Sequence, residues 1–92
     1  MEYEWDAAKA AENRHKHGVG FNAVLDFDWA TALVVADKRV DYGEPRWLAL
    51  GMIGMRLHSL AFTVRGERIR IISLRMASRK ERTLYEEEKT RR

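Results

Sequence analysis

The run RLHSLAFTVRGERIRIISLRMASRKERTLY, residues 56–85, decides the fold of this chain. It contains two stretches rich in apolar residues, which are separated by RGER at residues 65–68. Glycine at the first position of a two-residue loop is typical of a type II′ turn, because that position needs a positive φ angle. The run therefore predicts a β-hairpin with strands at 56–65 and 68–75, followed by a helix.

Pairing across this loop assigns the hairpin side chains to two faces. If residues 66–67 form the loop, Thr63 pairs with Arg70, and His58 pairs with Arg75. A slip of one residue would exchange the two faces. We expect the face that packs against N-terminal helices to carry His58, Leu60, Phe62, Val64, Ile69, Ile71, Ser73 and Arg75.

The other face of the hairpin is more polar and carries Arg65, Arg68 and Arg70 near its tip. Three like charges this close repel one another unless an anion or a carboxylate screens them. This face is therefore expected to meet phosphate groups.

The segment SRKE at residues 78–81 has the S-x-x-E pattern of a capping box, in which the first and fourth residues bond reciprocally. It predicts a helix that continues to about residue 89. Glu81 is expected to serve this cap, with a role as general base as the alternative. The positive end of the helix dipole predicts an anion site that includes Arg75, Arg79 and Lys80.

The start of the chain predicts an edge strand and a helix. Residues 3–5 alternate apolar and charged side chains, as a half-buried strand does. Asp6 is a typical N-cap, residues 7–17 are alanine-rich, and Gly18 stands where helices often end.

A second, shorter helix is predicted over residues 22–28, with Asn22 as its cap. Strands are predicted at 32–36 and 46–52. The apolar residues of the second helix that should face the core are Phe21, Val24 and Leu25. We therefore expect one α+β domain over residues 1–92, with a mainly antiparallel sheet of about four to five strands, two N-terminal helices on one face and a C-terminal helix.

The composition favours a small folded protein. The chain has 92 residues, of which 46% are hydrophobic, with one proline and no cysteine. This argues against a disordered tail, a disulfide framework or a thiolate metal site. No apolar run approaches the ~20 residues that cross a bilayer, and the start MEYEWD is acidic where a signal peptide is basic. We expect a soluble cytoplasmic protein that does not bind membranes.

Charge is unevenly distributed along the chain. The net charge is +3, but residues 1–55 hold 6 Lys and Arg against 9 Asp and Glu, whereas residues 56–92 hold 11 against 5. This polarity favours a polyanion as the partner of the C-terminal part, although a solvated basic surface gives the same pattern.

No metal site and no cofactor are expected. His15 and His17 lie two residues apart on the predicted helix, so their side chains diverge, whereas paired ligands need a spacing of three or four. Lys16 shares a helix face with Lys9 and Asn13. This face either lines a polar groove or is the solvent-facing side.

Three segments carry a family resemblance: EWDAAKAAENRHKHGV at 4–19, GEPRWLALG at 43–51, and TVRGERIRIISLRMASRKERTLY at 63–85. The most specific parts are residues 5–19 and 70–82. Together they resemble the BrnT toxins, ribonuclease toxins of type II toxin–antitoxin systems that are related in fold to RelE-type toxins. The resemblance implies a RelE-like domain that cleaves RNA and inhibits translation. It also implies neutralisation by a DNA-binding antitoxin, BrnA, in a hetero-oligomer.

Metal-free RNA cleavage is most simply attack of the 2′-OH on the adjacent phosphate, which needs a base, an acid and cations around the phosphorane. Guanidinium groups stay charged and bind phosphate oxygens in a bidentate way, so Arg75, Arg79 and Arg65 are expected to stabilise this transition state. The pool for the base and the acid is His58, His17, Glu44 and Tyr85; for Tyr85, core packing is the alternative. Further RNA-binding residues are expected to be Arg46, Arg70, Lys80, Arg82 and Lys16.

Two other functions fit the same residues. A basic nucleic-acid-binding module would show salt-sensitive binding without cleavage. A protein-partner domain would use its arginines to meet an acidic segment of another chain, and an antitoxin would be expected to bind in that way too.

Overall fold

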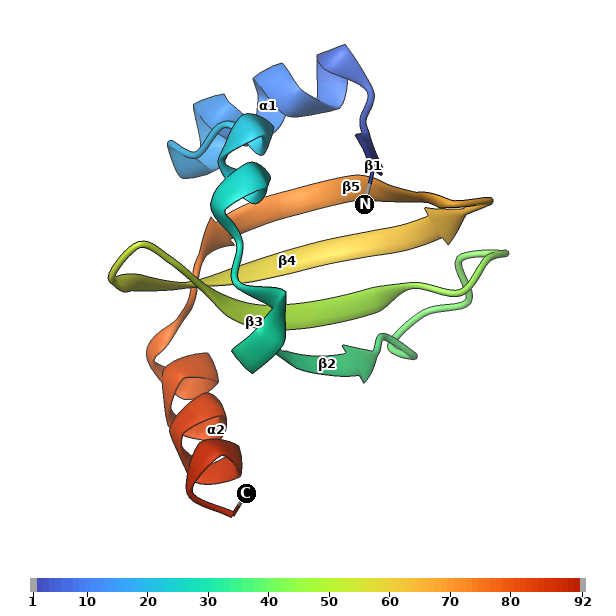
Figure 1. Ribbon diagram of the computed structural model, residues 1–92. Helices are drawn as coiled ribbons and strands as arrows, with labels where there is room; N and C mark the ends of the chain where they lie inside the picture. Colours follow the sequence, from blue (N-terminus) through green and yellow to red (C-terminus); the bar gives the residue numbers. More distant parts are fainter. Residues whose placement is uncertain (1, 92) are drawn as a thin grey trace.

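The computed structural model describes residues 2–91 and shows an α+β domain built on one sheet (Figure 1). The sheet has five strands in the order β1-β5-β4-β3-β2. β1 runs parallel to β5, and the other neighbours are antiparallel, which confirms the predicted fold class. In chain order the elements are β1 (Glu2–Glu4), α1 (Ala7–His17), the 3-10 helices η1 (Phe21–Asp26) and η2 (Trp29–Thr31), β2 (Leu33–Ala36), β3 (Trp47–Ile53), β4 (Arg56–Arg65), β5 (Arg68–Met76) and α2 (Arg79–Thr90).

The first helix begins and ends as its sequence predicts. The Asp6 carboxylate accepts a hydrogen bond from the Ala8 N–H at 3.3 Å, so Asp6 is the N-cap. Gly18 ends the helix with a φ of 73°, a left-handed conformation that glycine adopts at little cost. The prediction of α1 is therefore confirmed at both ends.

The second predicted helix is shorter and of another type. It is a 3-10 helix, its N-cap position is Gly20 and no side chain caps it, so the assignment of Asn22 as a cap was wrong. A 3-10 helix has three residues per turn, which places Phe21 and Val24 on one face. Both are buried, whereas Leu25 is 71% exposed. The expectation that Leu25 faces the core was therefore also wrong.

The register of the β4–β5 hairpin is as predicted near its turn and shifts farther along. Thr63 pairs with Arg70 as expected, and Gly66 has a φ of 61°. Between Phe62 and Ala61 the register shifts by one, so that Ile72 is the extra residue of a β-bulge.

The bulge overturns part of the predicted face assignment. Ser59 pairs with Arg75, and His58 pairs with Met76, so the predicted His58–Arg75 pair was wrong. Leu74 lies opposite Leu60 on the helix-covered face, where both are fully buried. The extra residue thus moves Ser73 and Arg75 to the opposite face and brings Leu74 into the core, which avoids burying a guanidinium group there.

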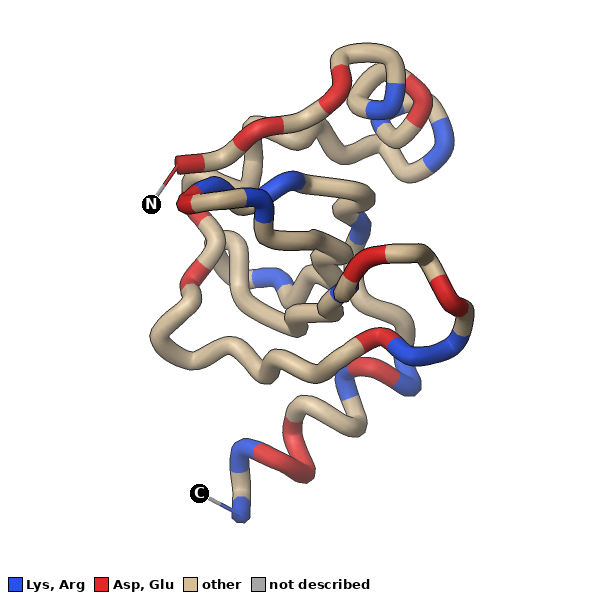
Figure 2. The backbone as a smooth tube through the Cα atoms, turned by 90° about the vertical axis from the view of Figure 1, so that its right-hand side faces the viewer, with Lys and Arg blue, Asp and Glu red and all other residues tan. Residues whose placement is uncertain are grey.

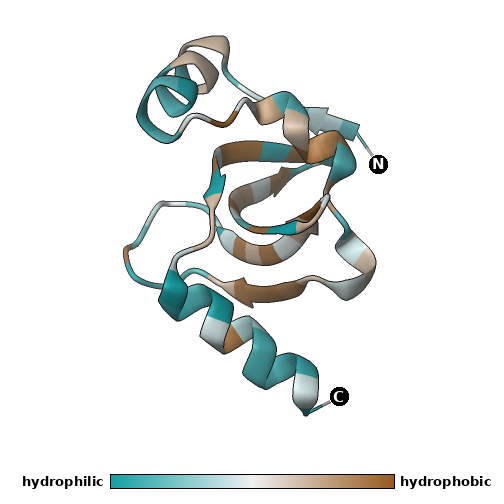
Figure 3. Cartoon of the chain, turned by 90° about the vertical axis from the view of Figure 1, so that its left-hand side faces the viewer, coloured by the Kyte–Doolittle hydropathy of each residue, from teal (hydrophilic) through white to brown (hydrophobic). Residues whose placement is uncertain are grey.

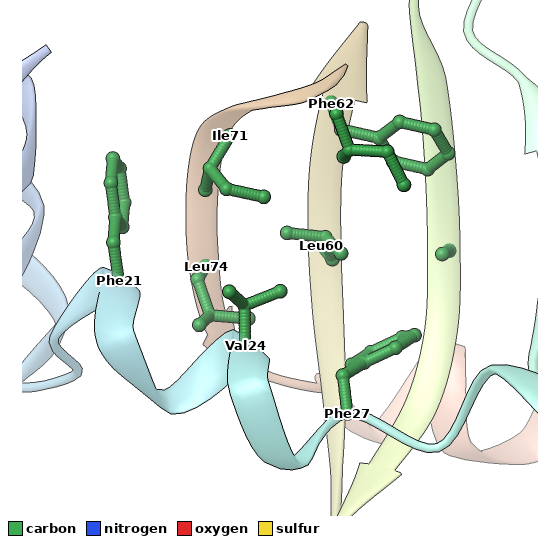
Figure 4. Packing of buried hydrophobic residues seen from close by; sticks show 9 residues of the cluster. Phe21, Val24, Phe27, Leu60, Phe62, Ile71 and Leu74 are labelled. Carbon is green, nitrogen blue, oxygen red and sulfur yellow. The ribbon is translucent and has the colours of Figure 1, made fainter. Parts of the chain in front are cut away.

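The main core lies between the sheet and the segment that contains η1 and η2 (Figure 4). The Trp29 ring packs edge-on against Phe27 and Phe62, with ring centroids 4.8 and 5.3 Å apart. Phe27 lies directly over Gly51, where a Cβ atom would overlap its ring. The buried side chains of this cluster are Phe21, Val24, Phe27, Ala49, Leu60, Phe62, Ile69, Ile71 and Leu74.

The opposite face of the sheet is covered only at one end, by α2. Within α2, only the Tyr85 side chain is buried, and it packs with Leu50, Leu57 and Ala77. In Figure 3 the strands apart from β1 are largely hydrophobic, while α2 is mostly hydrophilic and extends away from the sheet. No helix among residues 2–91 is both long and apolar enough to cross a membrane.

Candidate anion-binding site where β5 meets α2

Arg75 lies at the end of β5, and its guanidinium is held by the start of α2. Its Nη1 and Nη2 donate to Oε1 and Oε2 of Glu81 at 2.7 and 2.9 Å, and Nη1 also donates to the Met76 carbonyl at 3.2 Å. The Arg75 side chain is 36% exposed. It therefore presents a fixed positive charge to solvent on the face opposite η1.

Glu81 both caps the N-terminus of α2 and forms the ion pair with Arg75. The capping box is complete: the Ser78 N–H donates to Glu81 Oε1 at 2.8 Å, and the Glu81 N–H donates to the Ser78 hydroxyl at 3.2 Å. The hydrogen bonds from Arg75 chiefly, and then that from the Ser78 N–H, lower the pKa of Glu81 to about 2. The predicted cap is confirmed, and the low pKa argues against Glu81 as a general base near neutral pH.

Three further cations follow at the start of α2. Arg82 donates to the Ala77 carbonyl at 3.0 Å and, with Arg79, lines a groove of about 550 Å³ between α2 and the β3–β4 turn. At 100° per residue, Arg79 and Glu81 lie roughly 200° apart around the helix, so Arg75 and this groove flank different sides of α2. Within residues 2–91, no carboxylate pairs with Arg79, Lys80 or Arg82.

The backbone tube in Figure 2 shows how charge changes along α2. Lys and Arg lie at the start of the helix, and a run of acidic residues follows toward its C-terminal part. Lys89 and Arg91 add positive charge at the C-terminal end, while the cations of the first turns lie at the end that joins β5. The groove there has an apolar floor, which includes Met52, Met55, Leu57 and Tyr85.

The arginines at the hairpin tip are each paired with a carboxylate. Arg68 lies 3.2 Å from Glu2, and Arg70 lies 2.7 Å from Glu4. The carboxylates of the protein itself therefore screen the repulsion that was predicted between these arginines, and no bound anion is needed.

Arg65 is paired as well, and it lies far from Arg75. It lies 3.3 Å from Glu44. Since Arg75 pairs with Ser59, which lies six residues from Arg65 along β4, the two arginines are roughly 20 Å apart. The structure therefore does not bring Arg65 to the β5–α2 junction.

The two predicted proton-transfer candidates of this region are buried away from Arg75. His58 lies on the opposite face of the sheet and is 7% exposed, and its Nδ1 lies 2.9 Å from the Arg56 carbonyl. A carbonyl only accepts, so Nδ1 carries the proton. Tyr85 is 5% exposed and donates from its hydroxyl to the Thr31 carbonyl at 3.2 Å, which is core packing.

The loop between β2 and β3 holds the remaining predicted arginine. The Arg46 guanidinium stacks 4.1 Å over the Tyr42 ring, and its Nε is buried without a hydrogen-bond partner among the described residues. In the same loop, hydrogen bonds from Arg39 hold the pKa of the Asp37 carboxyl well below its usual range. These groups lie near the hairpin tip, because the Pro45 carbonyl accepts from Thr63.

Lys16 lines a separate small cavity of about 210 Å³ at the outer edge of β5. The other lining residues are Lys9, Glu12, Asn13, His17, Ile72 and Ser73. The predicted polar groove beside α1 is therefore present, and it lies beside the bulge. Across residues 2–91, no group of three or more His, Asp or Glu side chains is placed to hold a metal ion.

The pairing of Glu81 with Arg75 could not be predicted from the sequence. Six residues separate them, and neither a strand period nor a helix period spans the junction between the two elements. To predict this pair, one would need to know on which face of the sheet Arg75 lies. The bulge at Ile72 changes that face, and the sequence does not reveal the bulge.

The chain matches a known protein family over most of its length. A family described as "Ribonuclease toxin, BrnT, of type II toxin-antitoxin system" matches residues 5–81. The matched segment runs from just before α1 to the first turn of α2 and includes Arg75, Ser78 and Glu81. No curated protein matches the chain.

Proposed function

This chain belongs to the BrnT family of ribonuclease toxins of type II toxin–antitoxin systems, and we propose that it is an endoribonuclease whose RNA cleavage inhibits translation. The family match over residues 5–81 is the observation that carries the proposal. A partly exposed arginine fixed at the end of β5, next to three cations that have no carboxylate partner within residues 2–91, supports it chemically.

The proposed reaction is metal-independent attack of the RNA 2′-OH on the adjacent phosphate. The pentavalent phosphorane gains negative charge, and preorganised cations aimed at that charge lower the barrier. Arg75 is proposed to bind the scissile phosphate, because its guanidinium is already held in place. Arg79, Lys80 and Arg82 are proposed to bind neighbouring phosphates around the start of α2.

The other predicted site residues are proposed to have no direct part in the cleavage step. Arg65 and Arg70 are engaged by carboxylates, and Arg46 stacks on Tyr42, so we place all three outside the cleavage site. Lys16 is proposed to contact RNA that leaves the site across the edge of β5. His58 and Tyr85 are buried in structural contacts, and the proposal gives them no proton transfer.

The partner of such a toxin is an antitoxin. We propose a DNA-binding, BrnA-like antitoxin that forms a hetero-oligomer with this chain and covers the cationic start of α2. Toxin and antitoxin would act in the cytoplasm, where messenger RNA is translated.

The experiment that tests the function uses purified protein and single-stranded RNA. We expect fragments that end in 2′,3′-cyclic phosphate, formed equally well with and without EDTA, and growth arrest when expression is induced. Salt-sensitive RNA binding without any fragments would contradict the enzyme and support a binding module. Fragments that disappear in EDTA would contradict the metal-independent mechanism.

A further inference from the structure

We propose that Glu81 is a positioning residue for Arg75: it holds the Nη1/Nη2 edge of the guanidinium and so leaves the Nε/Nη2 edge free for an RNA phosphate. This inference rests on the proposed function, because it assumes that Arg75 binds the substrate. The inference specifies which edge of the Arg75 guanidinium binds the phosphate, and it names Glu81 as the residue that determines this edge.

The donors of Arg75 divide into two groups. A guanidinium has five N–H donors in a rigid plane, and two of its edges can each bind a carboxylate or a phosphate in a bidentate way. Both hydrogens of Nη1 are used, by Glu81 Oε1 and the Met76 carbonyl, and one hydrogen of Nη2 is used by Glu81 Oε2. Among residues 2–91, no acceptor bonds to Nε or to the second hydrogen of Nη2.

The two free donors lie side by side. Nε–H and the second Nη2–H point from the same edge of the plane, with a spacing that matches two phosphate oxygens. The Arg75 side chain as a whole is 36% exposed, so burial does not close it off from solvent. A phosphate therefore can bind Arg75 without displacing Glu81.

Glu81 is itself fixed by contacts that do not involve Arg75. The backbone N–H of Ser78 holds its Oε1 at 2.8 Å, and its own backbone belongs to the first turn of α2. The Glu81 side chain is only 22% exposed. The start of α2 is thus a rigid support, and it removes freedom from a long side chain before RNA binds.

Arg39 shows the opposite arrangement within the same chain. Its Nε and Nη2 donate to the two carboxylate oxygens of Asp37 at 2.8 and 2.9 Å. Arg39 therefore uses on Asp37 the edge that Arg75 keeps free. A phosphate cannot bind the Nε/Nη2 edge of Arg39 without displacing Asp37. The same edge of Arg75 has no such partner, so a phosphate can bind it.

The test compares two variants that weaken the same cap. Glu81→Gln retains an oxygen that accepts from the Ser78 N–H but cannot bind both Nη atoms of Arg75 as an anion. Ser78→Ala removes the hydroxyl cap and keeps the backbone N–H and the carboxylate. Cleavage of a single-stranded RNA is expected to fall at least about tenfold in kcat for Glu81→Gln. For Ser78→Ala it is expected to stay within about threefold of wild type.

A second measurement does not depend on cleavage. The NMR signal of the Arg75 Nε–H is followed while a 2′-O-methyl RNA oligonucleotide, which cannot be cleaved by its own 2′-OH, is added. In the wild type and in Ser78→Ala we expect this signal to shift, and in Glu81→Gln we expect the shift to be lost.

The outcomes separate the inference from the function on which it rests. If Arg75→Ala abolishes cleavage while Glu81→Gln cleaves as wild type does, the positioning role of Glu81 is wrong. Equal losses in Glu81→Gln and Ser78→Ala also overturn it, since they indicate only a weakened helix start. If Arg75→Ala cleaves normally, the proposed site itself is wrong.

Discussion

Asn13 shows how one polar residue connects the first helix to the sheet. It is 6% exposed, and its side-chain amide donates to the Leu74 and Val19 carbonyls and accepts from the Leu74 N–H. β1 pairs with β5 only as far as Arg70, so the outward peptide groups of Leu74 have no neighbouring strand. The amide supplies the donor and the acceptor that a strand would have offered.

Replacing Asn13 should therefore be costly. We expect Asn13→Ala to lower the free energy of unfolding by about 2–4 kcal/mol, because it leaves two buried backbone groups of Leu74 and the partly buried Val19 carbonyl without partners. Glu12→Ala, on the exposed side of the same helix, is the control and should change stability by less than about 0.5 kcal/mol. Urea denaturation of both variants measures the difference, and equal stabilities would contradict this role of Asn13.

At the scale of elements, most of the fold follows from local patterns. The Asp6 and Ser78 caps, the helix end at Gly18 and the hairpin turn at Gly66 were predicted because each depends on neighbouring residues. These local signals also place the strands within about one or two residues of where they lie.

The candidate site was predicted less completely, since it depends on contacts between elements. The junction of β5 and α2 was expected to bind an anion, and the structure does bring Arg75 to α2 there. The sequence could not show the bulge at Ile72, because a turn fixes the register only near itself. For that reason the predicted neighbour of Arg75 was His58, whereas the actual partner is Glu81.

The attachment of α2 should depend on pH through Glu81. Its pKa falls from 4.5 to about 2 on folding, chiefly because of Arg75. A lowered pKa contributes stability above the unfolded value, and this contribution is lost as pH falls from about 5 to about 2. Because solvent around the partly exposed Arg75 screens the pair, we expect about 1–2 kcal/mol.

Comparison of wild type with Glu81→Gln measures this contribution. The difference between their free energies of unfolding should be largest above pH ~5 and should shrink toward pH ~2. The Asp37 carboxyl, whose pKa is also lowered, titrates in both proteins and cancels in the difference. A difference that stays constant across this range would show that the charge of Glu81 does not stabilise the fold.

At the scale of the whole molecule, several charges of the acidic N-terminal part and of the basic C-terminal part form ion pairs with each other. The acidic N-terminal part and the basic C-terminal part meet at the hairpin tip, where Glu2, Glu4 and Glu44 pair with arginines. With these arginines paired, the positive charge that remains available to an anion lies elsewhere, for example on the cations at the start of α2. This arrangement could not be predicted from the charge counts alone, because it requires the parallel pairing of β1 with β5.

RNA binding should reflect this division of charge. Each phosphate contact on a single strand contributes about 0.7 to the slope of log K against log salt, so Arg79→Ala/Lys80→Ala should lower the slope by about 1 or more. Arg65→Ala/Arg68→Ala removes the same net charge from paired arginines and should change the slope by less than about 0.5. Binding of a 2′-O-methyl RNA at several salt concentrations measures both. Equal changes in the two variants would indicate that only net charge matters.

The most direct test of the central claim is the cleavage rate of single-stranded RNA by Arg75→Ala beside Arg68→Ala. Both variants remove one arginine from β5 and the same net charge, but only Arg75 is proposed to bind the scissile phosphate. We predict that Arg75→Ala lowers the rate by about 10²–10³-fold, as loss of a transition-state charge contact does, and that Arg68→Ala stays within about threefold of wild type. A rate for Arg75→Ala within about threefold of wild type would contradict the claim that the junction of β5 and α2 is the catalytic site.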